Sequence, residues 1–95
     1  MQVEFEFYAT IRDAVGEAAE TRTVESGATV EEALAALVEA HPDVRPLLYD
    51  GEGRVRPNIN VLVDGTNIRD AEGPETPLSA GTTVGVVPGV AGGRR

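Results

Sequence analysis

The chain has 95 residues, enough for a single domain, and its 16 acidic and 8 basic residues give a net charge of -8. This charge disfavours nucleic acid and anionic membranes as partners, and no apolar run approaches the roughly 20 residues that cross a bilayer. Cysteine and lysine are absent and His41 is the only histidine, so disulfides, iron–sulfur clusters, Schiff bases and multi-histidine metal sites are excluded. We therefore expect a binding or carrier protein and not an enzyme.

The N-terminal part of the chain is expected to form a β-hairpin. Val3, Phe5 and Phe7 alternate with polar or acidic residues, which is the period of a strand with one buried face. A helical turn over residues 11–15 follows. A second strand over residues 21–25 then pairs with the first.

Thr29 predicts the start of the main helix. Glu32 stands three residues later, which is the capping-box pattern. One stripe recurs at helical spacing and consists of Val30, Ala33, Leu34, Leu37, Val38 and His41. Pro42 disfavours helical backbone at the residue before it and ends the helix. At that end, His41 is expected to complement the helix dipole and not to bind a ligand.

The middle of the chain carries weaker signals. Residues 44–56 are expected to be irregular, with three apolar residues entering the core: Leu47, Leu48 and Val55. Residues 58–63 read as an interior strand. Asp64-Gly65 offers a two-residue hairpin turn into a short strand over 66–69.

The C-terminal part is expected to complete the sheet. A loop over 70–81, anchored by Leu78, precedes a last strand over 83–87 that lies beside the first strand. Antiparallel strands combined with one long helix predict an α+β domain over 1–87, with the helix packed across one sheet face. Residues 88–95 are rich in glycine and are expected to form a mobile tail.

Three apolar residues are expected on the outer face of the sheet. If the alternating residues of each strand face the helix, Tyr8, Leu62 and Val87 are left outward, beside the tail. Such a patch suits partner binding, although scattered surface apolar residues are the alternative. Arg12 is a further candidate because it could pair with an acidic group on a partner; a solvated surface arginine is the alternative.

The tail contains Gly92-Gly93, followed by Arg94-Arg95. Glycine has no Cβ, so a glycine pair is thin and flexible. It can enter a narrow active site of another protein and present an unhindered carboxylate there. The alternative is a glycine-rich end without a role.

Four stretches, in chain order, resemble the ubiquitin-like sulfur carriers. This family includes MoaD (the small subunit of molybdopterin synthase), ThiS and the small archaeal modifier proteins. The stretches are FYATIRD at 7–13 with Gly16, NINVLVDG at 58–65, TPL at 76–78 with Gly81, and PGVAGG at 88–93. The resemblance implies a β-grasp (ubiquitin-like) fold with a mixed sheet.

The resemblance also implies a function. In that family an adenylyltransferase resembling the ubiquitin-activating enzymes uses ATP and magnesium to adenylate the carboxylate of the last glycine. The product becomes a thiocarboxylate that donates sulfur, as in molybdopterin synthesis, or is conjugated to a lysine of a target protein. Gly93 would be the reactive residue, Gly92 would give access, and Tyr8, Leu62 and Val87 would contact the activating enzyme. The carrier itself supplies no catalytic group and binds no cofactor or metal.

Three features depart from the family pattern. Val87 stands where an aromatic residue is usual, Gly89 where a second proline is usual, and Arg94-Arg95 follow the glycine pair. Activation at Gly93 would therefore need a processing protease. A synthase large subunit and target proteins are further expected partners of an otherwise monomeric chain. The alternative is a non-covalent β-grasp binding module that has lost the carrier chemistry.

The location of the protein is expected to be the cytoplasm. The first six residues carry acids among apolar residues, unlike a secretory signal. High acidity, the lack of lysine and many small apolar residues favour a salt-rich cytoplasm, where ions screen the repulsion between acids. An ordinary acidic protein from a GC-rich genome is the alternative.

Overall fold

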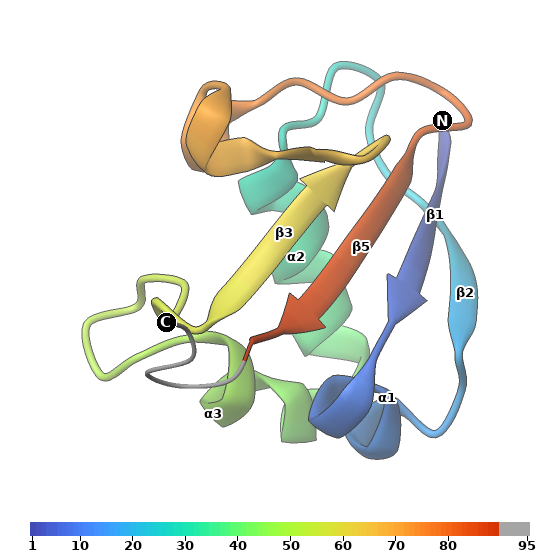
Figure 1. Cartoon of the computed structure of the whole chain (residues 1–95). Helices are drawn as coiled ribbons and strands as arrows, with labels where there is room; N and C mark the ends of the chain where they lie inside the picture. The colour runs from blue at the N-terminus through green and yellow to red at the C-terminus, as the bar shows by residue number, and fades with distance from the viewer. Residues whose placement is uncertain (90–95) are drawn as a thin grey trace.

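Five strands form one sheet in the computed structural model, which describes residues 1–89. The strands are β1 (Gln2–Phe7), β2 (Ala19–Thr23), β3 (Ile59–Val63), β4 (Thr66–Asn67) and β5 (Thr83–Pro88). Their order is β2-β1-β5-β3-β4; β1 and β5 run parallel, and the other neighbours are antiparallel. Helix α2 (Val30–Ala40) lies across one face of this sheet (Figure 1). The arrangement confirms the predicted α+β class and the adjacency of the first and last strands.

The N-terminal hairpin forms as predicted, with small shifts in its bounds. Val3, Phe5 and Phe7 are buried, and the two phenylalanine rings stack with their centroids 6.0 Å apart. Between the strands, α1 (Ala9–Val15) begins two residues before the expected turn and buries Ile11. It ends at Gly16, where φ is 90°, a left-handed conformation that favours glycine. β2 begins and ends two residues earlier than predicted.

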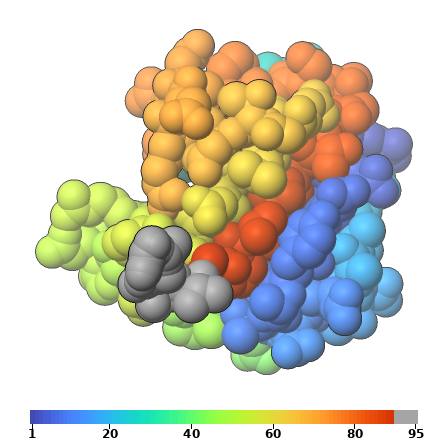
Figure 2. All heavy atoms as spheres, viewed as in Figure 1, coloured from blue at the N-terminus to red at the C-terminus, as the bar shows by residue number. Residues whose placement is uncertain are grey.

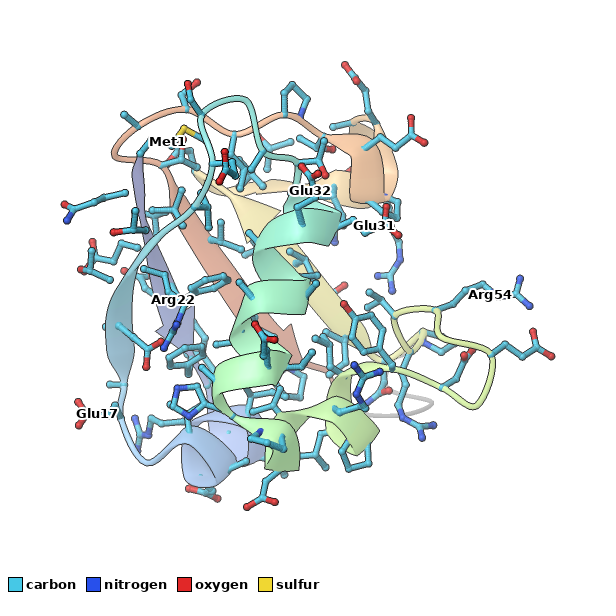
Figure 3. All side chains as sticks on the ribbon, turned by 180° about the vertical axis from the view of Figure 1, so that it is seen from behind. Met1, Glu17, Arg22, Glu31, Glu32 and Arg54 are labelled. Atoms are coloured by element: carbon cyan, nitrogen blue, oxygen red, sulfur yellow. The ribbon has the colours of Figure 1, made fainter. Side chains whose placement is uncertain are left out.

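Helix α2 confirms the predicted capping box. The Thr29 hydroxyl accepts a hydrogen bond from the Glu32 backbone N–H, and the Glu32 carboxylate accepts one from the Thr29 backbone N–H at 2.9 Å. Five of the six stripe residues are buried against the sheet: Val30, Ala33, Leu34, Leu37 and Val38. The sixth, His41, is the half-buried C-cap. Figure 3 shows Glu31 and Glu32 at the N-terminal end of α2, where acids complement the helix dipole.

The expectation of irregular structure over 44–56 is wrong in its first part. A 3-10 turn at Pro42–Val44 continues into a short helix, α3 (Arg45–Leu48). Proline is tolerated at the first positions of a helical turn, where its missing N–H has no partner to lose. The turns also bury Val44 and Leu48, so core packing favours them.

The second hairpin is shorter than expected. Asp64 and Gly65 form the predicted turn, with φ values of 49° and 89°. β4 covers only Thr66–Asn67, not 66–69, because the Asn67 side chain accepts a hydrogen bond from the Arg69 backbone N–H and starts a 3-10 turn over Ile68–Asp70. Ile68 is buried by this turn.

The last loop and strand follow the prediction closely. Leu78 is buried and anchors the loop over 70–81, which also contains a 3-10 turn at Gly73–Glu75. β5 then extends one residue beyond the expected end, to Pro88. The tail predictions that concern Gly92, Gly93 and Arg94-Arg95 lie outside the described residues.

Candidate functional site

The sheet face opposite α2 carries a hollow between β1, β5 and β3 (Figure 2 shows this face). Gly85 on β5 lies opposite Leu62 of β3 on one side and Glu6 of β1 on the other. The hollow is lined by Glu6, Tyr8, Leu62, Asp64, Gly65, Thr83 and Gly85. Because Gly85 has no side chain, its backbone forms the floor of the hollow, and residues of the neighbouring strands form the rim.

Tyr8 lies at the end of the hollow near α1. Its side chain is 44% exposed, and its hydroxyl donates a hydrogen bond to the Glu6 carboxylate at 3.1 Å. This hydrogen bond, the negative charge of Glu6 and slight desolvation raise the pKa of Tyr8. The phenol therefore stays protonated, and its ring offers an exposed apolar surface beside an acid.

Leu62, opposite Gly85 on β3, and Val87, two residues beyond Gly85 on β5, are both half-buried. A Cβ at position 85 would lie 3.8 Å from the Leu62 Cβ and 3.9 Å from a Val87 methyl carbon. The structure thus places Tyr8 and Leu62 around one hollow, with Val87 next to its floor. Their role in partner binding stays a prediction.

Arg12 lies apart from this hollow. It is exposed on α1, beside a separate shallow depression lined by Arg12, Asp13, Gly16, Glu17 and Ala18. Within residues 1–89 it forms no ion pair. The structure therefore does not bring Arg12 together with Tyr8, Leu62 and Val87 around the outer-face hollow, and its role in partner binding stays a prediction.

The chain leaves the sheet beside the start of β3. The Gly89 backbone N–H donates a hydrogen bond to the Asn58 carbonyl. A Cβ at position 89 would lie 3.3 Å from that same oxygen and 3.4 Å from the Asn60 side-chain nitrogen. The first distance is tight and the second is an ordinary contact, so a side chain here would require its neighbours to shift by a few tenths of an ångström.

Arg69 is a residue whose contacts sequence reasoning missed. One terminal nitrogen donates to the carbonyls of Ile59 at 2.8 Å and Pro57 at 3.1 Å. The other donates to the side-chain oxygen of Asn60 at 2.9 Å. A single arginine after a hairpin carries no sequence signal of its own, because these partners are brought to it only by the folded loop and strand.

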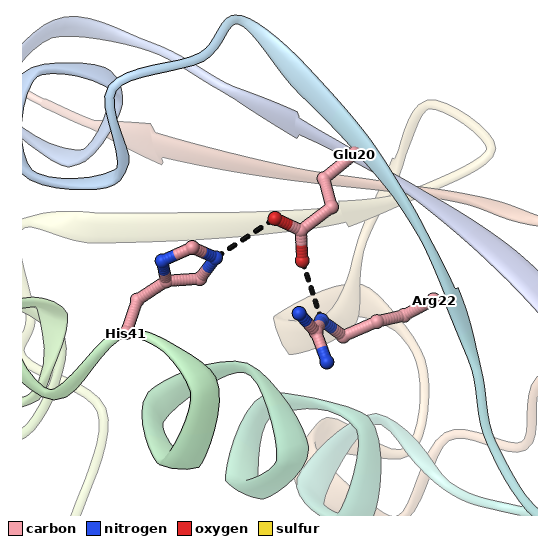
Figure 4. A network of polar contacts seen from close by, with 3 residues as sticks. All are labelled: Glu20, Arg22 and His41. Atoms are coloured by element: carbon pink, nitrogen blue, oxygen red, sulfur yellow. Dashed lines mark hydrogen bonds and ion pairs between the residues drawn. The ribbon is translucent and has the colours of Figure 1, made fainter.

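Glu20 joins β2 to the end of α2 (Figure 4). One carboxylate oxygen lies 2.8 Å from His41 Nε2, and the other accepts from Arg22. Partial burial raises the pKa of the Glu20 carboxyl, but the hydrogen bonds from His41 and Arg22 outweigh it, so the pKa lies below its usual value. This cluster lies away from the outer face, and we read it as structural.

Within residues 1–89 no group of three or more histidine, cysteine, aspartate or glutamate side chains is placed to hold a metal ion. Among the helices of that same part of the chain, none has the length and apolar character needed to cross a membrane.

A sequence profile of the ThiS family matches residues 5–93 of the chain. The chain belongs to the ThiS family. The matched stretch includes the predicted docking residues and Gly92-Gly93, and it leaves Arg94-Arg95 outside.

Relatives of this ThiS-family chain are small modifier and carrier proteins. Small archaeal modifier protein 3 of Haloferax volcanii is 36% identical over 93 residues, which cover 98% of this chain and 100% of the relative. The crystal structure of SAMP1 from Haloferax volcanii superimposes with a TM-score of 0.88 at 29% identity, covering 98% of this chain and 100% of that one. The Haloferax relatives fit the expected salt-rich setting.

A third neighbour comes from a structure of two proteins. In the BexX/CysO complex of Amycolatopsis orientalis, the matching chain has a TM-score of 0.76 and 30% identity, with 96% of this chain and 99% of that one covered. Together these comparisons confirm the ubiquitin-like β-grasp fold. They also place the ThiS-family chain among small modifiers and sulfur carriers.

Proposed function

We propose that this protein is a ubiquitin-like carrier that acts through the carboxylate of Gly93. The observation that carries the proposal is the family match over residues 5–93, which includes the glycine pair at the end of a domain with an open outer face. An activating adenylyltransferase would bind the domain, and ATP with magnesium would be bound by that enzyme. The carrier's own part is to dock and to deliver its terminus.

The chemistry begins with hydrolysis of the Gly93–Arg94 peptide bond by a protease. The freed Gly93 carboxylate attacks the α-phosphate of ATP, pyrophosphate leaves, and an acyl-adenylate forms. Sulfide then attacks the acyl carbon and displaces AMP to give a thiocarboxylate, or the amine of a target lysine displaces AMP and loses a proton to give an isopeptide bond. A synthase large subunit would use the first product, and protein targets would accept the second.

The outer face suits a partner of particular character. Tyr8 and Leu62 provide apolar surface, while Glu6 and Asp64 place carboxylates on the rim of the same hollow. Asp64 is held there because its carboxylate accepts a hydrogen bond from the Thr83 backbone N–H at 3.0 Å. A partner that inserts an apolar side chain flanked by arginine or lysine would match this pattern.

Intact-mass measurement tests the proposal. Chains ending at Gly93 and at Arg95 are incubated with the activating enzyme of the same organism, ATP, magnesium and a sulfur source. We expect the chain ending at Gly93 to acquire the mass of a thiocarboxylate, and the chain ending at Arg95 to stay unmodified unless the protease is added. If the chain ending at Gly93 stays unmodified as well, the proposal is rejected.

A second candidate is a non-covalent binding module. Arg94-Arg95 favour it, because they block the Gly93 carboxylate, and residues 1–89 contain the outer-face hollow. This candidate predicts that partner binding survives deletion of residues 92–95 and that no covalent product forms. The carrier proposal predicts a covalent product that this deletion abolishes.

A further inference from the structure

We propose that Arg69 is a positioning residue that fixes where the C-terminal tail leaves the sheet. The inference rests on the proposed function for its consequence, which is delivery of the Gly93 carboxylate. It rests on contacts within residues 57–89 for its geometry. Three contacts carry the argument. Arg69 binds the start of β3, the same guanidinium orients the Asn60 amide, and Asn58 and Asn60 together set the path of Gly89.

The first contact is made by the guanidinium of Arg69. Its planar fork donates to the carbonyls of Pro57 and Ile59, at 3.1 Å and 2.8 Å, and to the Asn60 side chain. Charge-assisted hydrogen bonds of this kind are stronger than neutral ones, and one rigid fork makes several at once. The segment that leads into β3 is therefore held against the 3-10 turn that carries Arg69.

The second contact orients the Asn60 amide. Its oxygen accepts from Arg69 at 2.9 Å and from the Asn67 side-chain amide at 3.1 Å. A flipped amide would point its own N–H groups at these two donors, so only one orientation satisfies the network. In that orientation the Asn60 nitrogen is turned toward Gly89.

The third contact is made by the backbone of Gly89. Its N–H donates to the carbonyl of Asn58, a residue between the carbonyls that Arg69 holds. A side chain at position 89 would meet that carbonyl at 3.3 Å and the Asn60 nitrogen at 3.4 Å. The last described residue therefore follows one path along β3, and Arg69 supports both groups that define the path.

The position of Gly89 limits where the Gly93 carboxylate can be delivered. Gly93 lies four residues beyond Gly89, and four extended residues span at most about 14 Å. A catalyst docked on the outer face would have its reactive site within that radius of Gly89. A displaced exit would leave docking intact but would misplace the carboxylate, and small misplacements of a reacting group cost up to about 100-fold in rate.

The test uses the chain ending at Gly93 and two variants, Arg69→Gln and the matched control Arg54→Gln. Arg54 is exposed, and Figure 3 shows its side chain on the loop after α3, pointing away from the rest of the molecule. ATP–pyrophosphate exchange with the activating enzyme gives kcat and KM for each carrier. We expect Arg69→Gln to lower kcat by about 10-fold to 100-fold and to leave KM within about twofold, with Arg54→Gln unchanged in both.

A second readout needs no enzyme. Amide hydrogen exchange at Gly89 is expected to be faster in Arg69→Gln than in wild type and unchanged in Arg54→Gln, at temperatures where all three chains are folded. Equal protection of Gly89 in all three would overturn the inference. If wild type fails in the exchange assay while Arg69→Gln still loses Gly89 protection, the exit role stands and the proposed function fails.

A third variant covers the case in which Arg69→Gln does not fold. Gly89→Ala perturbs the same exit from the other side, and it leaves the core and the outer-face hollow untouched. We expect a smaller loss of kcat at constant KM, because the neighbours of the added methyl group must shift by only a few tenths of an ångström. A Gly89→Ala chain with wild-type kcat would overturn the inference.

Discussion

Gly85 on β5 pairs with Leu62 on β3, and a Cβ at position 85 would lie 3.8 Å from the Leu62 Cβ. Glycine inside a strand destabilises the folded protein by roughly 0.5–1 kcal/mol relative to alanine. The backbone at Gly85 has no positive φ, and a Cβ there would make only ordinary van der Waals contacts. Space and backbone conformation therefore do not require glycine at this position, whereas the outer-face hollow does.

Filling the hollow should block partner binding without harming the fold. We expect Gly85→Gln to weaken binding of the activating enzyme by at least about tenfold, about 1.4 kcal/mol, because its side chain would occupy the space between Tyr8 and Leu62. Its unfolding free energy should equal or exceed that of wild type. Titration calorimetry and thermal unfolding measure the two quantities.

The matched control adds the same side chain to the opposite face. Ala35 is exposed on α2, so Ala35→Gln leaves the outer face of the sheet unchanged. Its binding should match that of wild type. Equal binding by Gly85→Gln and wild type would show that the partner does not use this hollow.

The cluster around Glu20 should stabilise the fold above acidic pH. We expect Glu20→Gln to lower the unfolding free energy by roughly 1 kcal/mol at pH 7, because the charged partner of His41 and Arg22 is lost. The pKa of Glu20 lies below the ordinary value of 4.5, so this contribution is present above that pH and is lost as pH falls through the lower, folded-state pKa. Urea unfolding at several pH values measures it.

Glu39→Gln is the control for Glu20→Gln, since it removes the same charge from an exposed position on α2. It should change stability by less than about 0.5 kcal/mol at every pH. A gap between Glu20→Gln and wild type that persists unchanged well below pH 4.5 would contradict the assigned role of the carboxylate.

The cap of α2 gives a third prediction. Thr29→Ala removes the hydroxyl that accepts from the Glu32 backbone N–H, and we expect it to cost about 1 kcal/mol of unfolding free energy. Thr29→Ser keeps the hydroxyl and should retain most of that stability. An alanine variant as stable as the serine variant would show that the capping hydrogen bond contributes nothing.

The lack of lysine predicts single attachments in conjugation. The only amine that the chain offers to another copy is its N-terminus, and in the structure that group donates to the Val24 carbonyl at 2.7 Å. We therefore expect target proteins to carry one copy per acceptor lysine. Denaturing gels of conjugates from cells that express the wild type should show no self-linked ladder, and an Ala35→Lys variant should permit one. A self-linked ladder formed by the wild-type chain would contradict this prediction.

Most of the fold could be predicted because its elements have clear local signals. The alternation around Phe5 and the capping box at Thr29 each specify an element, and the structure contains both. Helix α3 was missed because Pro46 reads as a breaker, although it stands at the start of a turn whose Leu48 is buried in the core. The early end of β4 depends on one side-chain hydrogen bond of Asn67.

The candidate site was only partly predictable for a related reason. Alternation along one strand tells which side Leu62 faces, but the hollow beside it depends on the register that brings Gly85 opposite. The contacts of Arg69 likewise depend on a loop and a strand that meet only in three dimensions. Such features are properties of neighbouring elements, and a single sequence does not display them.

The mass of the protein isolated from its native cell tests the central claim most directly. If the domain delivers a glycine carboxylate to an activating enzyme, part of that material must end at Gly93, as a free carboxylate, a thiocarboxylate or a conjugate. Native protein that always retains Arg94-Arg95 would contradict the account.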